Sequence, residues 1–178
     1  MYGLPGELKM ETIYIIKELA KNKKVFKSIF ENIDKQEYLW KPAPGKWCLL
    51  EILSHLYDEE KEDFRARIQH TFENPGEPMK PIDPVGWVLK RKYIEQDYKL
   101  VLEKFLEERD KSTEWLTALH EAKWENTYQH AQLGEISAAM FLSAWLAHDY
   151  LHMRQITRTK YQYLKNLTDN DLSYAGKW

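Results

Sequence analysis

The sequence predicts an all-α protein, specifically a four-helix bundle, and three observations support this. Four long segments carry apolar residues at the three- and four-residue spacing of an amphipathic helix. Proline and glycine are concentrated between these segments, where they end helices. No run of residues alternates between apolar and polar as a half-buried strand would. Helices of this kind bury their apolar stripes against one another, and a bundle is the simplest arrangement that does so.

The first helix is expected from Glu7 to about Asn32, and residues 41–46 then end the helical pattern with two prolines and a glycine before Trp47. Its apolar stripe consists of Ile13, Ile16, Leu19, Phe26, Ile29, Phe30 and Ile33. Charged residues fill the positions between them, as expected for a helix with one face in water.

The second helix is expected from Cys48 to about Phe72, and it starts with the spacing of a capping box because Glu51 follows Cys48 by three residues. Serine or threonine is the usual cap, and a thiol accepts hydrogen bonds only weakly. A thiol at a helix N-terminus can be a reactive nucleophile. The favoured interpretation of Cys48 is a small buried residue beneath Trp47, because free cysteines are commonly buried.

Residues 74–86 contain four prolines and two glycines, which excludes a regular element there. This segment is expected to cross the end of the bundle, or to form a lid or a partner surface. The third helix is expected over 90–119 and a connection over 121–133. The fourth helix is expected from about Gly134 to Leu164, followed by an irregular tail that packs back through Tyr174 and Trp178.

Composition limits the class of protein. A chain of 178 residues is long enough for one domain, 1–178, with a full core. The net charge of −2 gives no basic balance that would favour nucleic acid or an anionic membrane. No apolar run is long enough to span a bilayer, and the N-terminus lacks a signal-peptide pattern. A single cysteine excludes an internal disulfide framework and fits a reducing compartment, so a cytoplasmic location is expected.

Two histidines in the fourth helix, His148 and His152, are the strongest chemical signal in the sequence. They are four residues apart, so their rings share one face of the helix and can bind one metal ion together. Two ligands are too few for a tight site. His55 lies about two turns into the second helix and reaches the pair if helices two and four are antiparallel. An up-down-down-up order, with 74–86 as the crossover, provides this arrangement.

Asp58 and Glu59 follow His55 by three and four residues, on the same side of the helix. Either carboxylate would orient an imidazole through its second nitrogen, or act as a general base. Spacing alone leaves a three-histidine metal site and a set of ordinary core and surface histidines equally well supported. The remaining histidines, His70, His120 and His130, are expected on the surface or in loops.

Two motifs resemble signatures of the DinB/YfiT-like family. Residues 44–56 are Pro-Gly-Lys-Trp-Cys-Leu-Leu-Glu-Ile-Leu-Ser-His-Leu, similar to the family's second helix. Residues 148–156 are His-Asp-Tyr-Leu-His-Met-Arg-Gln-Ile, similar to its final-helix pattern H-D-x-x-H-x-x-Q-I. The resemblance covers nearly the whole chain. It implies an up-down-down-up bundle, frequent homodimers and a divalent metal ion held by His55, His148 and His152. Cys48 departs from the family, which usually has serine or threonine there.

Three imidazoles leave coordination positions open, as in catalytic rather than structural metal sites. Members of the resembled family include S-transferases that use bacterial low-molecular-weight thiols, and metal-dependent hydrolases. The sequence therefore predicts a metalloenzyme that activates a small thiol or water against a small-molecule substrate, using zinc, nickel, iron or manganese. The alternative is a non-catalytic bundle that binds metal or a small ligand in a stress response. A scaffold whose histidines bind nothing ranks last, and nucleic-acid binding is not expected.

Overall fold

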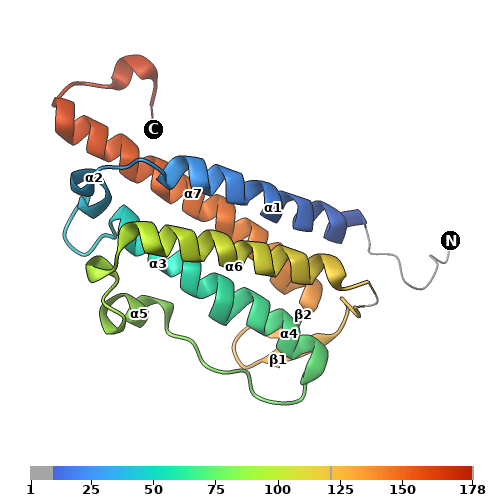
Figure 1. Cartoon of the computed structure of the whole chain (residues 1–178). Coiled ribbons are helices and arrows are strands. Elements are labelled where there is room, and N and C mark those ends of the chain that lie inside the picture. Colours follow the sequence, from blue (N-terminus) through green and yellow to red (C-terminus); the bar gives the residue numbers. More distant parts are fainter. Residues whose placement is uncertain (1–9, 121, 178) are drawn as a thin grey trace.

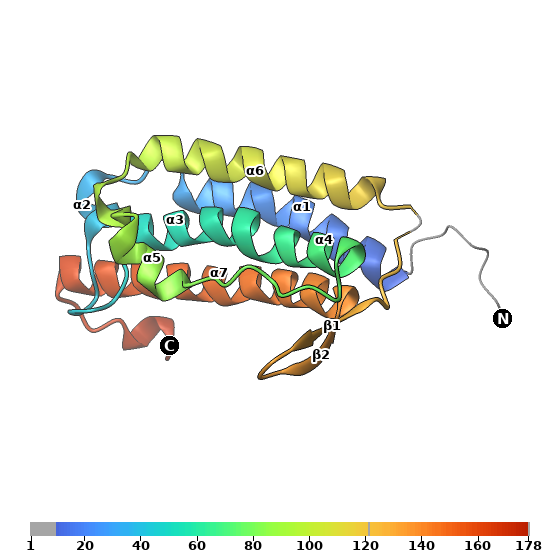
Figure 2. The ribbon, with the colours of Figure 1, turned by 90° about the horizontal axis from the view of Figure 1, so that it is seen from below.

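The structure, a computed structural model, describes residues 10–120 and 122–177, and four long helical rods dominate it (Figure 1). These are α1 (Met10–Phe30), the consecutive helices α3 (Leu49–Glu59) and α4 (Arg65–Glu73), α6 (Tyr98–Ala118) and α7 (Ala138–Thr168). Figure 2 shows α1 and α7 running in one direction while α3–α4 and α6 run in the other. The predicted up-down-down-up bundle is therefore confirmed. Among the described residues, no helix is both long and apolar enough to cross a membrane.

The core of the bundle consists of two apolar clusters that follow each other along its axis. One cluster includes Leu19, Ile68 and Trp145, and the other includes Phe26, Phe105 and Ile156. Each cluster takes side chains from α1, from α7 and from at least one of the other two rods, as the amphipathic patterns predict. Burial of these stripes holds α3 and α7 side by side, which positions the candidate site described below.

The second rod contains a π-helical turn, Glu60–Phe64, between α3 and α4. The sequence pattern predicted one continuous helix here and missed this turn. A π turn inserts an extra residue into an α-helix, so the residues after it are rotated about the axis relative to an uninterrupted helix. Glu59 and Glu60, at the start of the turn, are both buried. Turns of this kind occur frequently at functional sites.

The third rod begins at Tyr98 rather than at the predicted residue 90. Lys92 has a left-handed backbone with φ of 50°, which interrupts any helix passing through it. The Asp97 side chain accepts the Leu100 N–H at 2.8 Å and caps α6. Before this point the chain forms α5 (Pro84–Lys90) and a 3-10 turn (Tyr93–Glu95). The expectation that 74–86 holds no regular element is wrong at its end, since Pro84 fits the first turn of a helix.

The fourth rod begins at Ala138 rather than at Gly134, because a β-hairpin precedes it. Strands β1 (Thr127–His130) and β2 (Gly134–Ser137) pair antiparallel, and Gly134 has the positive φ of 74° that the turn requires. Ser137 then caps α7 by accepting the Met140 N–H at 3.1 Å. The expectation of a chain without strands is wrong for this hairpin.

Smaller differences lie near the two ends of the chain. A short helix, α2 (Lys35–Leu39), follows α1 and was not predicted. In the tail, a 3-10 turn (Ser173–Ala175) presents Tyr174 fully to solvent, so the expectation that this ring packs back is wrong. Glu7 and Trp178 lie outside the described residues.

Candidate metal centre

Three histidines from two antiparallel helices meet inside the bundle. His55 lies on α3, and His148 and His152 lie one turn apart on α7. The Nε2 atom of His148 is 3.3 Å from that of His55 and 3.0 Å from that of His152. His55 is buried and the other two rings are half-buried. Trp47 packs against His55 and Phe64 against His148, each with ring centroids 5.0 Å apart, so aromatic walls enclose the cluster.

Burial keeps these imidazoles neutral. It lowers the pKa of His55 to about 3 and that of His148 to about 2, and the neighbouring histidines act in the same direction. Burial also lowers the pKa of His152, against the opposing effect of the Gln155 side chain. Neutral imidazole is the form that binds metal, so the cluster does not have to lose protons before an ion binds at neutral pH.

The donor atoms fit a divalent cation. A tetrahedral ion with metal–nitrogen bonds of about 2.0–2.1 Å places its ligand nitrogens about 3.3 Å apart, close to the two separations observed. Among the residues that the structure describes, none hydrogen-bonds to the Nδ1 atoms of His55 and His152. If Nδ1 carries the proton in each ring, three lone pairs converge at Nε2. If Nε2 carries it in two rings, buried Nδ1 acceptors remain unpaired, which costs free energy. In the first arrangement, a cation bound among the Nε2 atoms would accept the three lone pairs and remove their mutual repulsion.

Of the two carboxylates predicted beside the cluster, Glu59 is the one that lies at His55. Its Oε1 atom is 4.0 Å from His55 Nδ1 and has no hydrogen-bond partner within the described part of the chain, and the side chain is buried. Burial, followed by the effect of Asp63, raises the pKa of Glu59 to about 9. The raised pKa favours the protonated form of Glu59, which lies beside His55 but beyond hydrogen-bond distance of its Nδ1 atom.

Asp58 makes other contacts. The Tyr93 hydroxyl donates to it, and Arg91 forms an ion pair with it at 2.8 Å. Arg91 also binds Glu62 through both of its terminal nitrogens, at 2.8 and 3.1 Å. Asp58 thus anchors the turn between α5 and α6 onto α3, and the structure does not bring it to the histidines.

A buried ion network that the sequence reasoning missed lies behind the cluster. Arg109 on α6 binds Asp149 with hydrogen bonds of 2.6 and 2.8 Å, and Glu60 at 2.8 Å. Asn22 of α1 donates to Asp149, and Trp145 of α7 donates to Glu60, each at 3.0 Å. Asp149 is fully buried between the two histidines of α7, so its pairing with α6 fixes the rotation of that helix. The sequence does carry one indication of this network: charged residues stand at positions that the apolar stripe of a helix would otherwise occupy.

Cys48 shows no sign of a reactive thiolate. It is fully buried, and burial raises the pKa of its thiol to about 11. Its backbone N–H donates to Glu51 at 2.8 Å, and the reciprocal half of the capping box is also present. The structure therefore supports the small buried residue rather than the nucleophile.

The other three histidines lie outside the cluster. His70 contacts the Glu77 carbonyl at 2.8 Å, and His130 Nδ1 accepts N–H groups of the hairpin turn at 3.2 Å. His120 is exposed in the connection after α6. These placements agree with the surface or loop positions expected for them.

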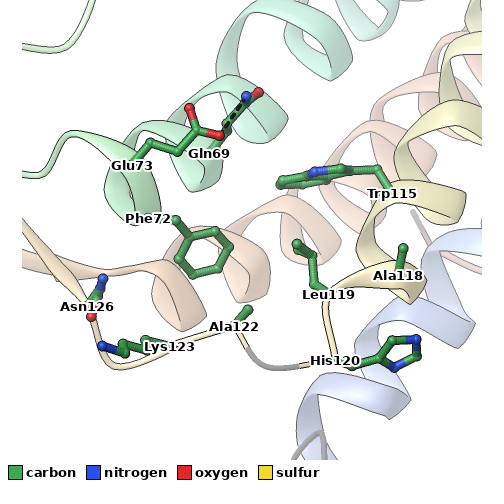
Figure 3. Close-up of a pocket in the computed structure, with 10 residues that line it drawn as sticks. All are labelled: Gln69, Phe72, Glu73, Trp115, Ala118, Leu119, His120, Ala122, Lys123 and Asn126. Atoms are coloured by element: carbon green, nitrogen blue, oxygen red, sulfur yellow. Dashed lines mark hydrogen bonds between the residues drawn. The ribbon is translucent and has the colours of Figure 1, made fainter. Parts of the chain in front are cut away.

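A cavity of about 480 Å³ lies between the C-terminal ends of α4 and α6 (Figure 3). Phe72, Trp115 and Leu119 contribute its apolar wall, and Gln69 donates to Glu73 at its edge at 3.0 Å. None of the three clustered histidines lines it. Glu73 and His120 also line it, but neither belongs to a converging set of three metal ligands among the described residues, so the histidine cluster remains the candidate centre.

The fold and the cluster together define a four-helix bundle with three histidines placed so that they could hold one metal ion. Comparison with known families agrees: the DinB superfamily matches residues 18–156, and the chain belongs to this superfamily. Among solved structures, it is similar to YfiT from Bacillus subtilis, described as a probable metal-dependent hydrolase with an unusual four-helix bundle topology. The TM-score is 0.77 at 16% identity, over 92% of this chain and 93% of YfiT. No curated protein sequence matches the chain.

Proposed function

We propose that the chain is a divalent-metal-dependent enzyme that activates a small thiol or water, of the S-transferase or hydrolase type. The observation that carries this proposal is the convergence of three neutral imidazoles, with Nε2 atoms 3.0 and 3.3 Å apart, from His55, His148 and His152. Membership of the DinB superfamily supports it, as does the description of YfiT as a probable metal-dependent hydrolase.

In this proposal, the histidines, Glu59 and the two aromatic rings have separate roles. His55, His148 and His152 hold the ion and leave coordination positions open. A divalent ion held there supplies a Lewis acid that lowers the pKa of bound water or thiol. Glu59 orients His55 through its Nδ1 atom and holds a proton close to the reacting groups. The rings of Trp47 and Phe64 exclude water from the histidines.

The first test is metal content, measured by plasma mass spectrometry on tag-free protein. We expect about one zinc, nickel, iron or manganese ion per chain, as for other three-histidine sites. The His148→Ala/His152→Ala variant should lose this ion. The matched control, His70→Ala/His130→Ala, removes two histidines outside the cluster and should retain it. Absence of metal from the wild type, with no uptake of zinc, nickel or manganese on titration, would overturn the enzyme proposal.

The second candidate function is a non-catalytic bundle that binds metal or a small ligand in a stress response. One observation favours it: the single cysteine is buried and protonated, and Asp58 is held by Tyr93 and Arg91. Neither of these two groups is therefore free to act as a nucleophile or base independent of the metal. Turnover of an electrophile with thiol by metal-loaded protein, absent from the His148→Ala/His152→Ala variant, would exclude this candidate.

A homodimer is a further proposal, since the superfamily resemblance implies it. Met140, Tyr150 and Leu151 are exposed along α7 and offer an apolar surface for a second copy of the chain. We expect light scattering to give twice the chain mass for the wild type. Leu151→Lys should reduce the measured mass to that of one chain, and a monomeric wild type would contradict the proposal.

A further inference from the structure

A second cavity, of about 290 Å³, continues the face of α7 that carries the clustered histidines. His148, His152, Gln155, Thr159 and Gln162 follow one another at alternating spacings of four and three residues, so they share one side of the helix. The last three line the cavity, together with Arg158 and with Lys46 and Trp47 from the loop before α3. The cavity therefore begins where the cluster ends.

Two lining residues connect the cavity to the histidines. The Trp47 ring lies 5.0 Å from the His55 ring, centroid to centroid, and also forms part of the cavity wall. Gln155 follows His152 by three residues on the same side of α7 and also lines the cavity. A molecule in this cavity thus lies against residues that neighbour two of the three candidate ligands, His55 and His152.

The charge of the cavity is entirely positive. Lys46 and Arg158 line it, and no aspartate or glutamate does. Neighbouring cations are neutralised, because Lys41 pairs with Glu51 at 2.7 Å and Lys160 with Glu37 at 2.6 Å. Lys46 and Arg158 form no such pair with any described residue. Two exposed cations without a counter-ion at a cavity favour an anionic ligand, and the guanidinium fork of Arg158 matches a carboxylate.

The dimensions limit the ligand. Arg158 follows His152 by six residues, which corresponds to about 9 Å along the helix axis. A molecule that reacts at the histidines and is held by the two cations therefore needs a chain of about four to six atoms between its reacting group and its acid group. The Trp47 ring offers an apolar surface for the middle of such a molecule.

We propose that this cavity is the subsite for the carboxylate of a small organic acid that reacts at the histidine cluster. This proposal rests on the proposed function, because it takes the cluster to be the reacting centre. Lys46 and Arg158 recognise the carboxylate, and Trp47 packs against the chain that joins it to the reacting group. The class of substrate or thiol co-substrate is therefore an acid rather than a neutral or cationic molecule.

The test compares 6-mercaptohexanoate with its primary amide, which has the same length and no charge. Dissociation constants are measured by calorimetry on zinc-loaded wild type and on Lys46→Gln/Arg158→Gln. In the wild type, the acid should bind about 10-fold more tightly than the amide, or better, as expected for charge-assisted hydrogen bonds. In the double variant this ratio should fall to about 1, while the affinity for the amide stays unchanged. Arg154→Gln, on α7 but outside the cavity, should keep the wild-type ratio.

The same pair of probes is measured on metal-free protein by saturation-transfer NMR. The two cations do not depend on the metal, so the preference for the acid should persist there while both affinities decrease. Failure to take up zinc would remove the proposed function and leave this preference intact. Equal binding of acid and amide to the wild type in both forms would overturn the subsite, whatever the zinc content. A preference that survives in the double variant would also overturn it.

Discussion

The histidine cluster and the Arg109 network are two buried polar groups of the same bundle, and they differ in how their polar atoms are satisfied. In the network, the guanidinium of Arg109 is bound by Glu60 and Asp149. In the cluster, the Nδ1 atoms of His55 and His152 lack hydrogen-bond partners in residues 10–120 and 122–177, and three Nε2 atoms face one another. Asp149 lies in sequence between the two histidines of α7, so adjacent residues of one helix serve both regions.

This difference separates polar groups that stabilise the fold from polar groups that can bind a ligand. A buried ion group with its partners in place holds helices in one arrangement, whereas a buried group with unused donors and acceptors is prepared for a ligand. Substitutions in either region test this comparison. The largest expected effect is on stability, at the network.

Arg109→Met should lower the free energy of unfolding by about 3–5 kcal/mol, because it leaves two buried carboxylates without their cation. Urea denaturation of metal-free protein measures this loss. The matched control is Lys23→Met, which removes a partly exposed ion pair of α6, formed by Lys23 of α1 with Asp110. The control should cost less than about 1 kcal/mol. Equal losses in the two variants would show that the network does not hold α6 against α7.

In metal-free protein, Glu59 and His148 should affect the pH dependence of the free energy of unfolding with opposite signs. The depressed pKa of His148 means that the unfolded chain binds a proton below pH 6.5 that the folded chain does not, so stability falls as the pH falls. The raised pKa of Glu59 has the opposite sign, because the folded chain holds that proton up to a pH of about 9. Between pH 6.5 and 5, Glu59→Gln should therefore lose about 2 kcal/mol more than the wild type.

Over the same interval, His148→Gln should lose about 1.5 kcal/mol less than the wild type. Urea denaturation at each pH, with a chelator present, gives both differences. The opposite signs are the decisive feature: two variants that shift the pH profile in the same direction would contradict the assignment of a protonated Glu59 beside neutral histidines.

The smallest effect is expected at Cys48, which is buried like both polar groups but bears no charge. Cys48→Ser should change the free energy of unfolding by less than about 1 kcal/mol, because the hydroxyl is the better cap while the thiol is the more apolar group. Thiol titration should detect Cys48 only after denaturant is added, given its burial and its raised pKa. Rapid labelling of the folded protein would show that the thiol is accessible.

The sequence predicted the fold and the convergence of the histidines because both depend on helical periodicity. His148 and His152 lie within one uninterrupted helix, where a spacing of four residues fixes their relation. His55 follows a recognisable helix start, and the antiparallel order of α3 and α7 brings it to the pair. These relations hold even where the predicted ends of the helices are wrong by several residues.

The rest depends on tertiary contacts that periodicity does not contain. The choice between Asp58 and Glu59 turns on a rotation of about 100° around α3, and neighbouring side chains from α5 and its following turn decide it. Arg109 meets Glu60 and Asp149 only in the folded bundle, across 49 and 40 residues of chain. The hairpin of β1 and β2 has strands of four residues, too short for alternation to stand out.

The π turn at Glu60–Phe64 divides the second rod into two parts, whose side chains are rotated about the axis relative to each other. Glu59 before it lies beside His55, and Phe64 at its end packs on His148 and Trp145. The extra residue changes the rotation of the second part about the axis, so that the part bearing His55 and the part that packs the far core each present a buried face to α7.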